Sequence, residues 1–389
     1  MNYILKFKER FSLINFFILI WVVSIPFKNG MYQVSTVLII LYFLFYVVKN
    51  KDYFNVKFIV SKYKDLIYIL LSIIFIMMIS NYVNSMNFDS YKIIINYIYR
   101  YGLILFVLLY FYSKKLLNAR SMFIYVLASL SIQALDGVHQ AIYGYDFFKA
   151  NVGNIYSGLT GSTSNRNIFA FFVGIGLIIT FLYNKDKNKY MYLFLSIFTF
   201  NVLFAYSRAI WVSLSVSFIV YLFFSYKNLT KKDLSYFAFF MVVLIFIFLN
   251  SESLSSRFDQ LIAGNSSQRI EIWLSSLPFI QENLFLGHGI DSAKYYDIYN
   301  GHYSLHNQTL EILFDIGLIG LVAYLFLLFL ILKELKYNKD IRLLAILIYL
   351  LVNGIFGESI ISSKTMLSTL TIFMFFVFVN RLDLKKDNK

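Results

Sequence analysis

The sequence predicts an all-α polytopic membrane protein with about twelve transmembrane helices and one large outer loop that contains short amphipathic helices. Composition, the spacing of apolar runs and the distribution of basic residues support this prediction. Of 389 residues, 59% are hydrophobic and only 14% are charged, whereas soluble domains average about 25% charged residues. The chain has no cysteine, which excludes disulfides, thiolate metal ligands and a thiol nucleophile.

The apolar runs give the number of spans. A helix needs about 20 mostly apolar residues to cross a bilayer, and twelve segments approach this length. They cover roughly residues 12–27, 31–48, 66–84, 92–112, 121–143, 168–183, 190–206, 209–225, 235–250, 308–333, 342–357 and 365–380. Ser207 and Arg208 form almost the whole connection between the seventh and the eighth.

The basic residues give the orientation. With both termini in the cytoplasm, the seven inward-facing segments carry 25 of the 35 Lys and Arg residues, and each has at least three. Cytoplasmic loops of membrane proteins are enriched in these residues. The net charge of +14 is therefore explained by orientation and requires no nucleic acid partner.

Two outer segments are much longer than the other loops. They are residues 144–167 and 251–306, and unstructured loops of such length are uncommon unless they are functional. The second has apolar residues at helical spacing, so we expect short amphipathic helices over the outer face. The expected organisation is nine transmembrane helices in 1–250, the loop with catalytic elements in 251–307, and three helices with a cytoplasmic tail in 308–389.

Two arginines stand out in or beside apolar segments. Arg208 lies between two spans, and an arginine at membrane depth costs ~2.5–3.5 kcal/mol on insertion scales, so it is usually paired or functional. The alternative is that it reaches the outer interface along its aliphatic stem. Arg269 lies in the outer loop within "NSSQRIEIW". The alternative to a functional role is that Arg269 lies on a solvated helix face and pairs with Glu271.

Two further polar groups begin spans. Arg166 lies in "GSTSNRNIFAFF", where Ser164 or Asn165 could cap the sixth span and Arg166 could simply mark its end. His306 and Asn307 precede the tenth span, and a histidine there is more often structural than catalytic. Imidazole titrates near neutral pH, however, and a helix N-terminus favours an anion.

Together these residues describe an oxyanion site on the outer side of the membrane. Guanidinium groups bind phosphate through a rigid fork of donors, and lipid-linked pyrophosphates are the natural phosphate substrates there. No metal site is expected. The loop carboxylates Asp259, Glu271, Glu282, Asp291 and Asp297 are not paired at ligand spacing, and His288 and His302 do not form a zinc motif with His306.

Four strings in this order resemble the O-antigen ligase family, which shares a superfamily with O-antigen polymerases. They are "GLTGSTSNRNIFAFF", "FAYSRAIWVSLSVS", "SSQRIEIWLSSLPFIQENLFLGHGID" and "HYSLHNQTLEILFDIGLIGLVAYL". The last is the most specific, with His-Asn followed by a Gly-x-x-Gly step at Gly317 and Gly320. The resemblance covers about residues 160–330, and the rest only by its span pattern.

The resemblance implies a multi-pass protein of the bacterial inner membrane with a periplasmic active site. It implies transfer of a glycan from undecaprenyl pyrophosphate to a sugar of the lipid A core, without a cofactor. The family's two functional arginines fall on Arg208 and Arg269, and its histidine on His306. Arg166, Asn165 and Asn307 are the expected substrate-binding residues, and membrane lipid is an expected partner.

Three other functions remain open from the sequence. The nearest is an O-antigen polymerase, which joins lipid-linked repeat units. The others are oligosaccharide transfer to protein and a twelve-span transporter. Transporters tend to place their polar residues near the membrane midplane, whereas here these residues lie in one outer loop and the span ends beside it.

Overall fold

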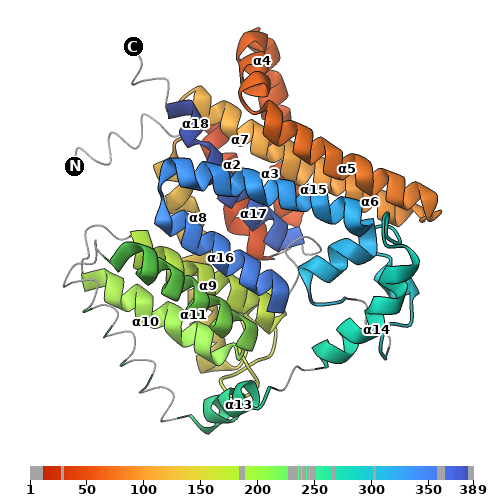
Figure 1. Ribbon diagram of the computed structural model, residues 1–389. Coiled ribbons are helices and arrows are strands. Elements are labelled where there is room, and N and C mark those ends of the chain that lie inside the picture. Colours follow the sequence, from red (N-terminus) through yellow and green to blue (C-terminus); the bar gives the residue numbers. More distant parts are fainter. Residues whose placement is uncertain are drawn as a thin grey trace.

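The computed structural model describes residues 12–27, 30–183, 189–226, 251–264, 268–300, 304–356 and 364–383, with four single positions between 235 and 245. These residues are almost entirely helices and connecting turns. The strand-like pairing that they contain is one isolated bridge between Tyr145 and Val152. The prediction of an all-α fold is confirmed (Figure 1).

Seven helical segments are long and apolar enough to cross a membrane. They are α3 (Gly30–Lys49), α5 (Lys64–Val83), the continuous run from α6 (Phe88–Tyr97) through η2 (Ile98–Leu103) to α7 (Ile104–Ser113), α8 (Ala119–Tyr143), α9 (Arg166–Tyr183), α11 (Arg208–Ser225) and α15 (Gln308–Asn338). Four shorter apolar segments overlap α2 (Leu13–Ser24), α10 (Lys189–Phe204), α16 (Ile341–Phe356) and α17 (Lys364–Phe378). The predicted ninth span, 235–250, lies outside the described residues except for single positions, so twelve spans remain a prediction.

The helices pack into one bundle in which neighbours along the chain mostly run in opposite directions (Figure 1). The most extensive pairings are α11 with α16, α9 with α10, α5 with α15, and α2 with α3. We call the end of the bundle where α9, α11 and α15 begin and α16 ends the loop end. The segment 144–165 and the short helices α13 (Glu252–Ile262) and α14 (Arg269–Glu282) lie there, and the latter two are the helices expected in the long loop.

The opposite end of the bundle holds ion pairs made by basic residues that the sequence placed in cytoplasmic segments. Arg381 donates to Asp65 at 2.7 Å and to Glu334 at 2.6 Å, which ties the region after α17 to α5 and α15. Lys114 pairs with Asp52 at 3.1 Å. These pairs and the loop end therefore lie at opposite ends of the helices, as the alternating charge pattern predicts.

The predicted span 308–333 is not a continuous helix. Gly317 has φ 65° and ψ −167°, a backbone conformation that is essentially restricted to glycine. The chain bends there, so α15 consists of a short segment before the glycine and a long one after it. Two hydrogen bonds that a regular helix would make, from Leu318 to Phe314 and from Ile319 to Asp315, are replaced by bonds to the outer loop.

The loop 284–289 fills this break in α15. The break frees two carbonyl oxygens and two N–H groups of α15, and the loop backbone bonds to all four. The bonds are His288 N–H to Phe314 O (2.7 Å), Gly289 N–H to Asp315 O (2.9 Å), Leu318 N–H to Leu284 O (2.8 Å) and Ile319 N–H to Phe285 O (3.3 Å). The two backbones approach so closely that a Cβ on Gly287 would lie 2.5 Å from the carbonyl carbon of Asp315. Gly287 and Gly317, the latter from the Gly-x-x-Gly step seen in the sequence, both lie where these two backbones meet.

Candidate active site at the loop end

Three arginines come together at the loop end. Arg166 begins α9, Arg208 begins α11, and Arg257 lies in α13, which packs on α11. The positive charges of Arg166 and Arg257 both act on the Arg208 guanidinium, and the charge of Arg257 acts on Arg166. The Nη1 atom of Arg208 is removed from solvent. A partly buried group of like charges is a place where a bound anion would relieve repulsion.

Local hydrogen bonds fix where Arg166 and Arg208 start their helices. The side-chain oxygen of Asn165 accepts from the backbone N–H of Asn167 at 2.8 Å and of Ile168 at 3.1 Å, so Asn165 caps α9. Ser207 then donates to the side-chain oxygen of Asn167 at 3.0 Å. This bond connects the residue before Arg208 to the residue after Arg166, which holds the two helix starts side by side.

The segment 144–165 owes its shape to polar residues on one face of α8. The Asp136 carboxylate accepts from Phe147 N–H and Ser162 N–H, both at 2.8 Å. Gln140 accepts from the backbone N–H of residues 160 and 161 at 2.8 and 2.9 Å. The folded segment then lies against Arg166, since a Cβ on Gly158 would stand 3.8 Å from Arg166 Cδ.

Asp136→Ala is therefore expected to destabilise the segment that supports Arg166. The change leaves the buried N–H groups of Phe147 and Ser162 without their acceptor, which costs about 1–3 kcal/mol for each buried unsatisfied group. The measurement is the thermal unfolding midpoint of the detergent-purified protein. An equal midpoint for Asp136→Ala and the unchanged protein would contradict this role, and Asp89→Ala is the control because Asp89 is an exposed residue bonded to Lys92.

Arg269 reaches the same end of the bundle from α14. It is the first residue of that helix, and its Nη1 donates to the carbonyl oxygen of Phe356, the last residue of α16. This contact joins the start of α14 to the end of α16. This bond places Arg269 beside the outermost turn of α16.

The packing of α16 on α11 brings that turn to the level of Arg208. Ser217 in α11 donates to Ala345 O in α16 at 2.7 Å, and the two helices run in opposite directions. Arg208 and Gly354 each lie nine residues from this contact, toward the loop end. At 1.5 Å per residue both are displaced by about 13 Å along the bundle, so Arg208 and the end of α16 occupy the same layer.

His306 lies at the start of α15, close to the end of α16 and to α14. Its neighbour Leu305 accepts a 2.9 Å hydrogen bond from Trp273 Nε1, and Trp273 is one helical turn from Arg269 on the same face of α14. A Cβ on Gly354 would stand 2.7 Å from Gln308 Oε1. Both contacts bring the residues flanking His306 next to Arg269 and the α16 end.

Hydrogen bonds also fix the conformation of His306 itself. Its φ is 49°, a left-handed value that is uncommon outside glycine. Its N–H donates to Ser304 Oγ at 3.2 Å, and that hydroxyl donates to Glu311 at 2.7 Å. Asn307 caps α15 by accepting from the N–H groups of Thr309 and Leu310, as Asn165 does for α9.

The structure thus arranges the predicted residues around one layer of the bundle, with Arg166 and Arg208 on one side and Arg269 and His306 on the other. Sequence reasoning missed Arg257, Asp136 and Gln140. The two α8 residues had a signal, because polar side chains four residues apart inside an apolar span are costly and usually functional. Arg257 had no such signal in the sequence, since a single arginine in a short amphipathic helix is typical of a solvent-exposed surface.

Residues 191–325 match the family model described as O-antigen ligase. The matched region includes Arg208, Arg257, Arg269 and His306, and it ends beyond the break in α15. A comparison with curated proteins found no match to the chain.

The apolar helices and this match together define an integral membrane protein of the glycosyltransferase type. Residues 191–325 are similar to the O-antigen ligase family, in agreement with the resemblance seen in the sequence. Its superfamily contains O-antigen ligase- and polymerase-like membrane glycosyltransferases. Arg166 and Asn165 lie before the matched region.

Proposed function

We propose that this protein transfers a glycan from undecaprenyl pyrophosphate to a sugar of the lipid A core, on the periplasmic side of the bacterial inner membrane. The observation that carries the proposal is the group formed by Arg166, Arg208 and Arg257, with Arg269 and His306 in the same layer of the bundle. A diphosphate has the charge and the oxygen geometry that guanidinium forks bind best. The family match supports a glycan as the transferred group.

The proposed reaction is a displacement at the anomeric carbon of the donor sugar. The acceptor hydroxyl forms the new glycosidic bond, the bond from the anomeric carbon to the phosphate oxygen breaks, and the configuration inverts. His306 takes the hydroxyl proton. The arginines stabilise the negative charge that develops on the departing diphosphate, and a partly dehydrated site strengthens this interaction. The arginines supply the positive charge that a metal provides in other enzymes, so the scheme requires none.

Asn165 and Asn307 have secondary roles in this scheme. Each uses its side-chain oxygen to cap a helix, and each retains an amide NH2 group that can donate. We propose that these groups donate to donor oxygens beside Arg166 and His306.

Arg257→Ala is expected to lower glycan transfer about 10- to 100-fold, because hydrogen bonds to charged groups contribute about 1.5–3 kcal/mol. Arg257→Lys is expected to recover part of this loss by restoring the charge but not the fork. The measurement is the initial rate at saturating acceptor, with Lys92→Ala as the control, since Lys92 is exposed at the loop end and pairs with Asp89. Full activity of Arg257→Ala would show that Arg257 does not contribute to the donor site.

The decisive experiment uses purified protein in nanodiscs, an undecaprenyl pyrophosphate-linked glycan and a panel of acceptors. Product on lipid A core supports the proposal. Product formed only by joining lipid-linked repeat units would identify a polymerase, and product only on protein would identify an oligosaccharyltransferase. Loss of the gene provides a second test: without a ligase, bare core accumulates with polymer still on its carrier, whereas without a polymerase single repeats reach the core.

A further inference from the structure

A short helix, α4 (Tyr53–Lys62), joins α3 to α5 at the end of the bundle opposite the loop end. Its 10 residues extend about 15 Å, which is too short to cross a bilayer. The helix is interrupted at Tyr63, whose φ and ψ are −114° and 23°, and α4 lies across the line of α5 (Figure 1). Asp65, which follows directly, belongs to the ion pairs of this end. We therefore place α4 at the level of the membrane surface.

One face of α4 is fixed to the bundle. Ile59 is fully buried in the core, and α4 packs on α7. Just after α4, the Tyr63 hydroxyl donates to the carbonyl oxygen of Phe378 at 2.9 Å. Just before it, Asp52 pairs with Lys114 at 3.1 Å. Contacts at both ends thus hold α4 in one orientation, so the direction of its other face is set by the fold.

The other face of α4 is exposed, and it mixes apolar side chains with a lysine. It consists of Tyr53, Phe54, Lys57 and Val60, and Phe54 is 81% exposed. Lys57 is three or four residues from each of the other three, so all of them are its neighbours on the helix surface. This mixture suits the head-group layer of a membrane. Aromatic rings can enter the apolar region there, while a lysine stem keeps its ammonium group at the level of the phosphates.

The positive charges around α4 are not balanced within the chain. The carboxylates of residues 49–65 are Asp52 and Asp65, and they are engaged by Lys114 and Arg381. In the part of the chain that the structure describes, the exposed lysines of this segment have no ion-pair partner. They are Lys49, Lys51, Lys57 and Lys64. The segment therefore presents a surplus of positive charge to its surroundings.

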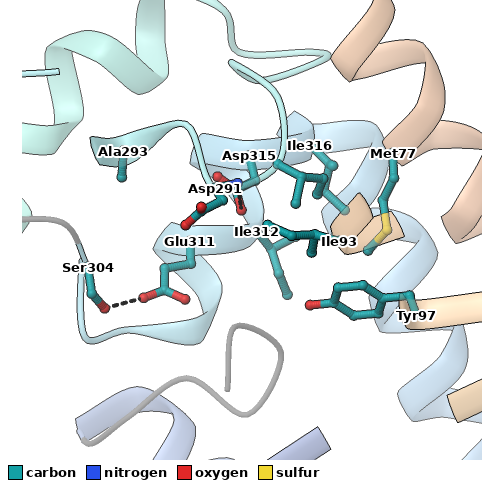
Figure 2. A pocket seen from close by; sticks show the side chains of 11 residues that line it. Met77, Ile93, Tyr97, Asp291, Ala293, Ser304, Glu311, Ile312, Asp315 and Ile316 are labelled. Atoms are coloured by element: carbon teal, nitrogen blue, oxygen red, sulfur yellow. Dashed lines mark hydrogen bonds between the residues drawn. The ribbon is translucent and has the colours of Figure 1, made fainter. Parts of the chain in front are cut away.

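The loop end uses its charged side chains differently. Beside the start of α15, Ser304 donates to Glu311 at 2.7 Å (Figure 2), and Lys294 pairs with Asp291 at 2.6 Å. Lys92 on α6 pairs with Asp89 at 2.9 Å. These two lysines thus have carboxylate partners on the chain, unlike the lysines around α4.

The position of α4 decides which negatively charged partner fits. An acidic protein and an anionic membrane surface both carry the required charge. However, α4 is joined directly to two membrane-crossing helices and lies across them, which places its exposed face among the head groups of the surrounding lipids. Helices with lysines and aromatic residues bind in this layer, and anionic lipids strengthen the binding.

We propose that the exposed face of α4 and the lysines beside it bind anionic phospholipid head groups, with Tyr53 and Phe54 entering the apolar region beneath them. This contact is separate from glycan transfer and does not depend on the proposed function. It makes the seating of the bundle in the membrane sensitive to the lipid composition at this end.

Lipid capture by a site-specific cross-linker tests the proposal. The chain has no cysteine, so Ser61→Cys, on the exposed side of α4, carries a benzophenone label at this position alone and leaves Phe54 and the lysines intact. The labelled full-length protein is placed in nanodiscs of phosphatidylglycerol and phosphatidylcholine. We expect the label to capture phosphatidylglycerol at least about threefold above its share of the membrane, and high salt to reduce this enrichment because salt screens exposed charges.

The matched control is the same label on Tyr82→Cys. Tyr82 is 80% exposed at the other end of α5, and residues 66–91 contain no lysine or arginine. We expect this position to capture the two lipids in proportion to their shares. Lys57→Gln and Lys64→Gln should each lower the enrichment at residue 61 about fivefold at most, the contribution of one lysine near an anionic surface, whereas Lys92→Gln should leave it unchanged. Equal unfolding temperatures would show that these variants remain folded.

Three results would overturn the inference. The first is capture of phosphatidylglycerol at residue 61 only in proportion to its share, as at residue 82. The second is enrichment that persists in the variant with both Lys57→Gln and Lys64→Gln. The third is an absence of lipid capture at residue 61 together with capture of a protein in cell membranes, which would assign this face to a protein partner.

Discussion

Arg208→Ala is expected to lower glycan transfer by at least about 100-fold, the effect usual for removing one preorganised group that stabilises transition-state charge. Arg208 belongs to the arginine group, because the charges of both Arg166 and Arg257 act on it. Its fork is held at the start of α11 by the bond between Ser207 and Asn167. The loss should appear mainly in kcat, since the charge on the diphosphate grows as the glycosidic bond to it breaks.

The measurement is a steady-state rate with purified, membrane-inserted variants. Arg342→Ala serves as the control, because Arg342 pairs with Asp340 at the opposite end of the bundle. Arg208→Ala and Arg257→Ala combined should cost less than the sum of the two single losses, as residues that act on one group are not additive. A transfer rate for Arg208→Ala within twofold of the unchanged protein would exclude the proposed donor site.

Gly317→Ala is expected to produce a large loss of stability. Its φ and ψ belong to a region that costs a non-glycine residue about 1–3 kcal/mol. A Cβ there would also stand 2.3 Å from the carbonyl carbon and oxygen of Phe285, so the loop would have to move away. The hydrogen bonds between the loop and both sides of the break would then be lost.

The readout is the unfolding temperature together with the rate of proteolysis in the outer loop. Gly102→Ala is a matched control, because Gly102 also lies in a transmembrane segment but has nothing within 4 Å of the position of a Cβ. An unchanged unfolding temperature and an unchanged proteolysis rate for Gly317→Ala would mean that the close approach of the two backbones does not exist in solution.

The sequence predicted the helical class and most helix positions, because long apolar runs and the distribution of Lys and Arg are strong signals. It also predicted that Arg208, Arg269 and His306 are exceptional, since such residues are costly beside apolar spans. Their arrangement could not be predicted, because the bonds that bring them together come from distant residues. Arg269 bonds to Phe356 O, for example, and nothing in the sequence around either residue predicts this contact.

The break in α15 was missed for a related reason. A Gly-x-x-Gly step within an apolar run ordinarily indicates close packing of two helices, and nothing local distinguishes that from a bend. The bend is stable only because the loop 284–289 supplies partners for the interrupted helix.

The exchange of hydrogen bonds at Gly317 also limits how this protein can be divided. Without the loop 284–289, the backbone groups at the break in α15 have no hydrogen-bond partners, and the loop loses its partners in the same way. Unpaired backbone groups are very costly in hydrocarbon. The loop 284–289 and the interrupted part of α15, residues 314–319, therefore depend on each other for their backbone hydrogen bonds. A hybrid enzyme built from two relatives should take both segments from the same parent, because segments from different parents would not be matched to each other at this contact.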